Sequence, residues 1–322
     1  MRLPLIFVLA WSAFAAEGPP PVPPGARVEM DAHNCYPYDG RWKDRIERAL
    51  SAGTPLAIEQ DLYWYTDAAT GESRSIVSHG GKPIDGKEPS MRDYFFERIR
   101  PIMEKALREG NRGDWPLITL NLDFKSNEAV HHAAVWKLLG EYEGWLCTAE
   151  RLADAKKVAP MRAGPLLVLT GDPDSQERDF HDIVPVGARL LVFGAVRTLR
   201  EEFDTPKEEI FAGGETNYRR WWNNPWKVVE EGGQPKAGDW TGADDRRLRT
   251  LVAYAHRKGL WIRFYTLDGD TAEDLKTNGW FDDYNFGSRA AAEIRWGAAK
   301  RAGTDYIASD HYEALAAFLK AH

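Results

Sequence analysis

Three short groups of polar residues near the N-terminus bring together side chains that could do chemistry jointly. They are His33-Asn34, Glu59-x-Asp61 and His79, and each follows a short apolar run typical of a β-strand. Carboxylate and amide oxygens are the ligands that hard divalent cations take, and imidazoles transfer protons near neutral pH. The combination indicates cleavage of a phosphodiester, a reaction served by both a cation and proton transfer.

The Glu59-x-Asp61 pair predicts a metal site. Residues two apart on a strand point to the same face, so these carboxylates converge, which is unfavourable unless a cation or a proton intervenes. The alternative is an acidic pair on the surface of an edge strand. The apolar neighbours Leu56, Ile58 and Leu62 make the strand mostly buried and favour the metal site.

Two more residues at expected strand ends could complete this site. Asn34 ends the first strand and Asp123 ends the third. With Glu59 and Asp61 they would form an all-oxygen site of charge -3. Such a site takes one divalent cation, Ca²⁺ or Mg²⁺, rather than zinc, because no Cys/His cluster takes part. Lys125 lies on the same face as Asp123 and could bind a phosphate oxygen, although an ion pair along the strand is an equal alternative.

His33 and His79 are the candidates for proton transfer because they bracket the carboxylates. A single histidine more often serves as a structural hydrogen-bonding group, and the other histidines lie on helices, in loops or at the C-terminus. His311, at the end of the last expected strand, remains an additional candidate. A glycosidase with Glu59 and Asp61 as its acid/base pair is a weaker hypothesis, because two neighbours on one strand cannot flank a glycosidic bond.

Short apolar, β-rich runs alternate with helical patterns along the chain. Eight strands that alternate with helices predict an α/β protein, a (β/α)8 TIM barrel, because parallel strands need helical crossovers and one closed sheet buries all of them. The expected strands are Val28–Asn34, Leu56–Trp64, Leu117–Phe124, Trp145–Thr148, Leu166–Thr170, Leu190–Val196, Trp261–Leu267 and Tyr306–Asp310. The expected helices are Trp42–Ala52, Met91–Arg108, Glu128–Tyr142, Asp244–Lys258 and Ala290–Arg301.

A long Trp-rich insertion, Arg197–Gly242, is expected after the sixth strand, and a shorter excursion that carries His79 after the second. Segments that follow barrel strands lie on the face where active sites form. Trp221 and Trp222 are therefore candidate substrate-binding residues. The alternative is a satellite core that packs the insertion onto the barrel.

The bulk composition limits the classes of partner and the location. The 322 residues carry a formal net charge of -7, so a general affinity for nucleic acid is not expected. Residues 1–15 are typical of a secretory signal peptide, residues 16–25 form a Pro-rich spacer, and residues 26–322 are expected to form one domain. We therefore expect a protein exported to the periplasm or outside the cell, without a transmembrane anchor. Its two cysteines, Cys35 and Cys147, are expected to be free thiols, and the oligomeric state stays open.

The motifs His33-Asn34, Glu59-x-Asp61, His79 and Asp123-x-Lys125 resemble those of the phospholipase-C-like phosphodiesterase superfamily. Its members include phosphatidylinositol-specific phospholipases C and glycerophosphodiester phosphodiesterases. The resemblance implies a distorted (β/α)8 barrel. It also implies His33 and His79 as the general acid/base pair, and a cation held by Glu59, Asp61 and Asp123, with Asn34 as in the calcium-dependent members.

The implied substrate is a small-molecule or lipid-headgroup phosphodiester, such as a phospholipid headgroup or a glycerophosphodiester. Two departures leave the alcohol open. The His-Arg-Gly and Pro-Glu-Asn-Thr signatures of the glycerophosphodiesterases are absent, and Asp123 replaces the more usual Glu. A non-catalytic barrel that only binds a ligand is the alternative from another functional class.

Overall fold

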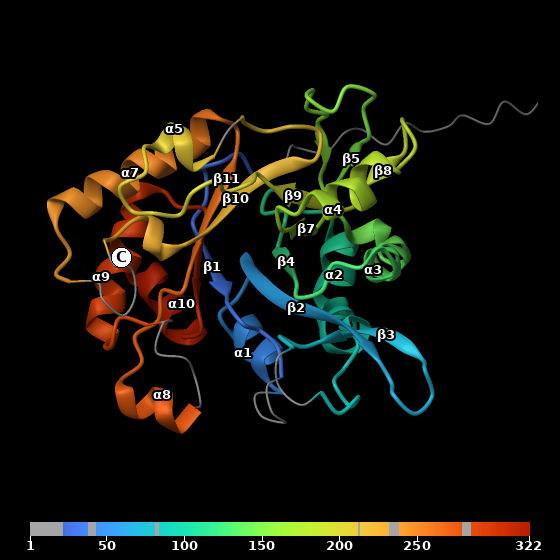
Figure 1. Ribbon diagram of the computed structural model, residues 1–322, viewed down its shortest axis with the longest axis horizontal. Coiled ribbons are helices and arrows are strands. Elements are labelled where there is room, and N and C mark those ends of the chain that lie inside the picture. The colour runs from blue at the N-terminus through green and yellow to red at the C-terminus, as the bar shows by residue number, and fades with distance from the viewer. Residues whose placement is uncertain (1–21, 38–42, 81–83, 212, 232–237, 279–284) are drawn as a thin grey trace, which may run out of the picture.

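A closed parallel β-barrel forms the centre of the computed structural model, which describes residues 22–37, 43–80, 84–211, 213–231, 238–278 and 285–322 (Figure 1). Neighbouring strands pair in the order β1, β2, β4, β7, β9, β10, β11 and β12, and β12 pairs with β1 to close the ring. The predicted TIM-barrel fold is confirmed. The barrel strands are β1 (Glu29–Ala32), β2 (Leu56–Thr66), β4 (Ile118–Phe124), β7 (Leu166–Thr170), β9 (Phe193–Ala195), β10 (Arg219–Pro225), β11 (Trp261–Tyr265) and β12 (Tyr306–Ser309).

Helices surround the barrel and cover the apolar outer faces of its strands (Figure 1). Local signals fix several of their ends. Helix α7 begins at a capping box in which Thr241 and Asp244 bond each other's backbone N–H groups, and α9 ends at Gly303 with a φ of 78°. The regular helices are α1 (Arg45–Ser51), α2 (Glu97–Glu109), α3 (Ala129–Glu141), α4 (Asp174–Glu177), α5 (Lys207–Ile210), α7 (Gly242–Arg257), α8 (Ala272–Asn278), α9 (Arg289–Ala302) and α10 (Tyr312–Ala321).

The β2–β3 hairpin extends away from the barrel (Figure 1). Strand β3 (Ser73–Val77) pairs antiparallel with the far end of β2, so it adds a ninth strand outside the closed ring. Hydrogen bonds to the segment after β4 and to helix α3 hold the hairpin in place. The Trp64 backbone N–H donates to Ser126 Oγ at 2.8 Å, and Ser75 Oγ contacts His131 Nε2 at 2.9 Å. The chain returns along β3 to the barrel rim, where His79 follows.

The expected barrel strand Trp145–Thr148 is wrong. Trp145 ends a 3₁₀ turn, Glu143–Trp145, and Thr148 begins β5 (Thr148–Glu150). Strand β5 lies in a separate antiparallel sheet with β6 (Met161–Arg162) and β8 (Arg189–Leu190). The apolar run is buried, but it does not form one of the strands of the closed barrel.

Part of the expected Trp-rich insertion, Arg219–Pro225, is the barrel strand β10. Strand β10 pairs parallel with β9 on one side and with β11 on the other. Trp221 points into the barrel, where its indole N–H donates to the Thr170 carbonyl at 2.8 Å. Trp222 points outward, with its ring centroid 4.6 Å from that of Phe211. Both indoles are fully buried and neither lines the cavity at the strand ends, so the prediction that Trp221 and Trp222 bind substrate is wrong.

Substitution of Trp222 tests this correction. Trp222→Phe shrinks a buried side chain and removes the indole bond to Thr198 Oγ1, which measures 3.1 Å. We expect the free energy of unfolding to fall by about 1–2 kcal/mol in urea denaturation. KM for a turned-over substrate is expected to stay unchanged. A raised KM with unchanged stability would instead show that Trp222 contributes to substrate binding.

The barrel interior changes from apolar at one end to polar at the other. At the amino ends of the strands, apolar side chains fill the interior, among them Ala57, Leu167, Phe193, Trp221 and Trp261. On β2 and β4 the register pairs Glu59 with Asn121 and Asp61 with Asp123. The inward positions of these strands therefore become polar toward their carboxyl ends, which is where the predicted site residues lie.

The chain just before β1 packs against the amino end of the barrel. The Val22 carbonyl accepts a 2.9 Å hydrogen bond from the Trp261 indole, and the Gly25 N–H donates to Asp305 at 2.7 Å. The expected signal peptide, residues 1–15, lies outside the described residues. Within the described part of the chain, no helix is long and apolar enough to cross a bilayer. Cys35 and Cys147 are both buried free thiols, as predicted.

Candidate functional site

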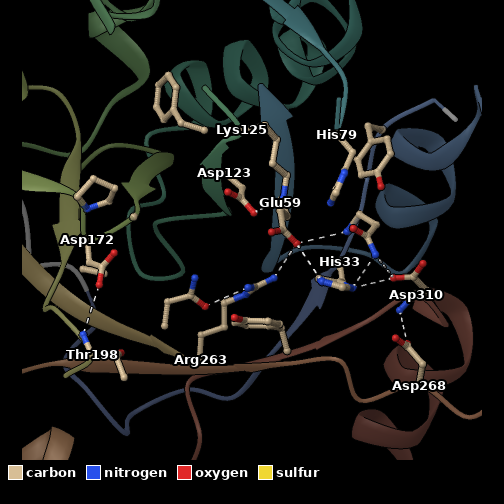
Figure 2. A pocket seen from close by; sticks show the side chains of 18 of the residues that line it. His33, Glu59, His79, Asp123, Lys125, Asp172, Thr198, Arg263, Asp268 and Asp310 are labelled. Carbon is tan, nitrogen blue, oxygen red and sulfur yellow. Dashed lines mark hydrogen bonds and ion pairs between the residues drawn. The ribbon is translucent and has the colours of Figure 1, made fainter. Parts of the chain in front are cut away.

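A cavity of about 630 Å³ opens at the carboxyl ends of the barrel strands (Figure 2). Six of the predicted site residues line it, and a seventh, Asp61, lies fully buried next to Glu59 and Asp123. The remaining lining residues come from seven of the strand ends and the loops beyond them. The predicted residues in the lining are His33, Asn34, Glu59, His79, Asp123 and Lys125, and those not predicted include Asp172, Thr198, Asn223, Arg263, Tyr265, Asp268 and Asp310.

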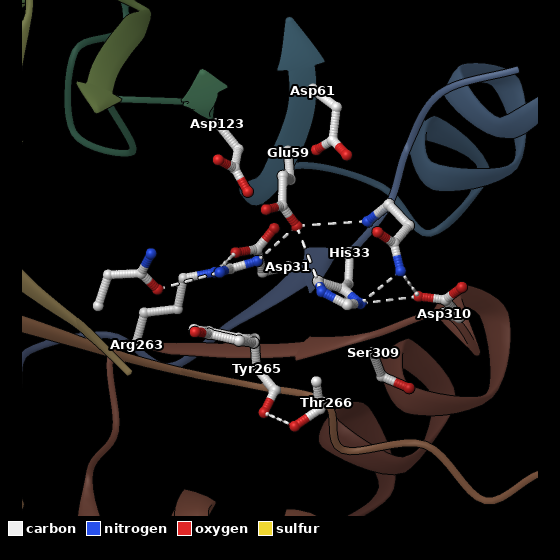
Figure 3. Close-up of polar contacts among 12 residues, drawn as sticks. Asp31, His33, Glu59, Asp61, Asp123, Arg263, Tyr265, Thr266, Ser309 and Asp310 are labelled. Carbon is white, nitrogen blue, oxygen red and sulfur yellow. Dashed lines mark hydrogen bonds and ion pairs between the residues drawn. The ribbon is translucent and has the colours of Figure 1, made fainter. Parts of the chain in front are cut away.

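Three carboxylates converge beside this cavity, as predicted from the strand spacing (Figure 3). One oxygen from each of Glu59, Asp61 and Asp123 lies within 4.8 Å of the others. Neither oxygen of Asp61 has a hydrogen-bond partner among the described residues. Burial raises the pKa of Asp61 well above its ordinary value, although Lys125 opposes the shift. Orphaned carboxylate oxygens in an all-oxygen group fit a hard divalent cation.

Lys125 is the counter-ion of this acidic group. Its Nζ atom lies 2.7 Å from Asp123 Oδ2 and 3.5 Å from Asp61 Oδ2. Burial disfavours the ammonium, but the two carboxylates outweigh burial and raise the pKa of Lys125. Both roles weighed from the sequence are therefore compatible with its position, because the ion-paired ammonium also lines the cavity.

Arg263 supports the floor of the site and was not recognised from the sequence. Its guanidinium is buried between Asp31 and Glu59, with 2.9 Å to Glu59 Oε2, and also donates to Asn223 Oδ1 at 3.0 Å. Burial opposes ionisation of Glu59, but the Arg263 and His33 charges lower its pKa to about 2. Glu59 is therefore ionised and fixed in orientation before any ligand binds.

His33 lies between two carboxylates at the end of the first strand. Its Nδ1 atom is 2.9 Å from Asp310 Oδ1, and its Nε2 atom is 3.6 Å from Glu59 Oε2. Burial alone would disfavour the imidazolium, but Glu59 and Asp310 raise the pKa of His33 to about 9. The ring is therefore oriented on both sides, as a proton-transfer group must be.

Asn34 contributes its backbone as well as its side chain. It has a φ of 51°, a left-handed conformation that asparagine tolerates, and its N–H donates to Glu59 Oε2 at 3.3 Å. The side-chain amide nitrogen donates to Asp310 at 3.2 Å and lies 3.0 Å from His33 Nδ1. These contacts hold Asn34 between Glu59 and Asp310, and its predicted role as a metal ligand stays a prediction.

His79 lies at the rim of the cavity, two residues after β3, and is exposed. Figure 2 shows its ring and that of His33 directed toward the space beside Glu59. Partial desolvation, followed by the charge of Lys125, lowers the pKa of His79. The two predicted histidines thus meet at one site, although one is buried in the barrel wall and the other stands at its edge.

Asp310 and Asp268 form a second network that the sequence did not reveal. Asp310 accepts from His33 and Asn34 and pairs with Arg45 at 3.3 Å. Asp268 accepts from the Asp310 N–H, and from Ser309, at 2.6 Å each. The available signal was weak, because Asp310 ended an expected strand without any partner close in sequence. His311, the additional candidate, lies 3.5 Å from Asp270 and is not among the cavity-lining residues.

Comparisons with known proteins agree with the fold. No protein-family model matches the sequence, and no curated protein matches it significantly. The structure is similar to a calcium-dependent phosphoinositol-specific phospholipase C from the Gram-negative bacterium Pseudomonas sp. The identity is 14%, 91% of this chain and 92% of that chain are covered, and the TM-score is 0.50.

Two further solved structures show weaker likeness. One is a glycerophosphoryl diester phosphodiesterase from Parabacteroides distasonis, at 14% identity, with 94% and 88% of the two chains covered and a TM-score of 0.43. The other is HPPK-DHPS from Plasmodium falciparum, at 7% identity, with 92% and 48% covered and a TM-score of 0.44. The likeness to the phospholipase C, at 14% identity, concerns the fold alone, so the activity must be argued from the site itself.

Proposed function

We propose that this protein is a metal-dependent phosphoric diester hydrolase that works by acid–base catalysis. The observation that carries the proposal is the convergence of two histidines, three carboxylates and one lysine on a single cavity at the carboxyl ends of the strands. In TIM barrels this is the face where catalysis takes place. The phospholipase C with the same fold provides a precedent for such chemistry in this architecture.

His33 and His79 are the proposed proton-transfer pair. One imidazole accepts the proton of the attacking hydroxyl, which belongs either to water or to the substrate's own alcohol. The other donates a proton to the leaving alkoxide, so that neither charged oxygen has to form free in the site. Asp310 and Glu59 keep the ring of His33 in place through both steps, since they lie against its two nitrogens.

Glu59, Asp61 and Asp123 are the proposed ligands of one divalent cation, with Asn34 as a further oxygen ligand. A bound cation would neutralise the charge that builds up on the non-bridging phosphate oxygens. Calcium is the first cation to test, since the similar phospholipase C is calcium-dependent, and magnesium is the second.

The proposed substrate is a phospholipid headgroup or a glycerophosphodiester-like molecule. A cavity of about 630 Å³ is within the range that takes small organic ligands, roughly 300–1,000 Å³. We also propose that the protein is exported after removal of residues 1–15, as the signal-peptide pattern of the sequence indicates. A glycosidase is disfavoured, because Asp61 is fully buried and cannot reach a sugar in the cavity.

Hydrolysis of a chromogenic phosphodiester tests the proposal. We expect turnover in the presence of Ca²⁺ or Mg²⁺, and a loss of about 10²- to 10³-fold when a chelator removes the cation, because a bound cation is worth several kcal/mol of charge stabilisation. Readdition of the cation should restore the rate. Absence of turnover with both cations, on chromogenic and glycerophosphodiester substrates alike, would favour a non-catalytic binding barrel.

A further inference from the structure

The acidic group of Glu59, Asp61 and Asp123 already contains one positive charge of its own. Lys125 Nζ contacts Asp123 at 2.7 Å and Asp61 at 3.5 Å, and it is the cation that reaches these two carboxylates within the described residues. Arg263 is engaged with Asp31 and Glu59 on the opposite side. The charge of Asp61 and Asp123 is therefore balanced by a single flexible side chain.

A divalent cation in this group would take ligand oxygens from Asp61 and Asp123, the two carboxylates that Lys125 now faces. The three carboxylate oxygens lie within 4.8 Å of one another, which leaves little distance between a central cation and the Lys125 ammonium. Two positive charges this close to each other, next to the buried Asp61, repel each other. The ammonium and the cation therefore compete for Asp61 and Asp123.

The Lys125 side chain can also turn away from the two carboxylates and into the cavity. Its side chain is 22% exposed and lines the cavity, as do Asp123 and His79 (Figure 2). A lysine carries its charge on four rotatable carbons and can turn without moving the backbone. A phosphate oxygen in the cavity offers the released ammonium a charge-assisted hydrogen bond.

We propose that Lys125 and the divalent cation exchange places. In the cation-free protein the ammonium neutralises Asp61 and Asp123, and binding of the cation releases it into the cavity, where it binds the phosphate of the substrate. Lys125 thus stabilises the empty site and serves substrate binding only in the loaded site. This inference rests on the proposed function, because it takes the cation at Glu59, Asp61 and Asp123 as given.

Thermal denaturation with and without Ca²⁺ tests the exchange without any activity measurement. Lys125→Met keeps the apolar stem and removes the charge. In chelator we expect this variant to melt about 5 °C below the wild type, because the buried Asp61 and the partly exposed Asp123 lose their counter-ion. At saturating Ca²⁺ the difference should vanish, because the cation supplies the missing charge. Lys227→Met is the matched control, since Lys227 pairs with Glu201 at the same cavity, and it should follow the wild type in both conditions.

Each other result contradicts the exchange. Equal melting temperatures of Lys125→Met and the wild type in chelator would show that Lys125 does not neutralise the empty site. A difference that persists at saturating Ca²⁺ would show that Lys125 keeps its carboxylates when the cation is bound. If neither Ca²⁺ nor Mg²⁺ raises the melting temperature of the wild type, the metal site itself fails, and the diesterase assay then decides separately whether hydrolysis survives.

The wild-type protein provides a second test in case Lys125→Met does not fold. A crystal structure with Ca²⁺ bound should show Lys125 Nζ out of ion-pair contact with both Asp61 and Asp123 and directed into the cavity. A structure with the cation bound and the Lys125–Asp123 ion pair intact would overturn the proposal.

Discussion

His33→Ala and His79→Ala are each expected to lower kcat for a chromogenic phosphodiester by about 10²- to 10⁴-fold, the usual contribution of a general acid or base. The fold should survive both changes. His79 is exposed at the rim, and loss of His33 leaves Asp310 paired with Arg45 and Glu59 paired with Arg263. Steady-state kinetics, together with far-UV circular dichroism, provide the measurement.

The double variant sharpens this expectation. Because the two histidines act in one proton-transfer cycle, the loss in His33→Ala/His79→Ala should be far smaller than the product of the single losses. His322→Ala, at the exposed C-terminus, is the control histidine and should retain full activity. Full diesterase activity in either single variant would remove that histidine from the proposed centre.

Asp61→Asn is expected to lower diesterase activity by about 10²-fold or more, and yet to stabilise the cation-free protein. The activity falls because the proposed cation loses a charged ligand, which costs several kcal/mol of transition-state stabilisation. The stability rises because Asp61 is fully buried and neither of its side-chain oxygens has a hydrogen-bond partner among the described residues. Lys125 keeps its shorter ion pair, 2.7 Å to Asp123, when the charge of Asp61 is removed. We expect a gain of about 1–3 kcal/mol in the free energy of unfolding in chelator, measured by urea denaturation.

Opposite changes in stability and activity identify a residue kept for a ligand and not for the fold. Asp85→Asn is the matched control, because Asp85 is an exposed carboxylate paired with Lys87, and neither quantity should change. A loss of stability for Asp61→Asn in chelator would mean that its carboxylate is a satisfied structural partner. The metal site would then lose its strongest support.

The sequence patterns predicted most of the barrel strands correctly and two segments of the chain wrongly. Seven of the eight expected strands overlap barrel strands, because an apolar, β-rich run is a local pattern that the sequence shows directly. Strand β10 was missed because Arg219-Arg220 and Asn223-Asn224-Pro225 flank its tryptophans with residues typical of a loop. Pairing with β9 and β11 decides its conformation, and no local pattern reveals such pairing.

For the site, too, the sequence predicted some residues and missed others. Glu59, Asp61 and Asp123 could be found because strand periodicity alone places them on one face and at one end. The residues that orient the site could not be found in this way. Arg263 and Glu59 are 204 residues apart, and His33 and Asp310 are 277 residues apart, so only closure of the barrel brings each pair together. Sequence reasoning found the residues that are proposed to react and missed the residues that hold them in place.

Because His79 follows the β2–β3 hairpin and His33 follows a strand of the closed barrel, displacing the two histidines requires different free energies. His33 follows β1, which is paired on both sides within the closed ring, so its position is lost only when the barrel itself unfolds. His79 follows β3, an outer strand paired on one side, and local opening of such an element needs less free energy than global unfolding. Local opening of the hairpin would therefore separate the proposed proton-transfer pair while the rest of the molecule stays folded.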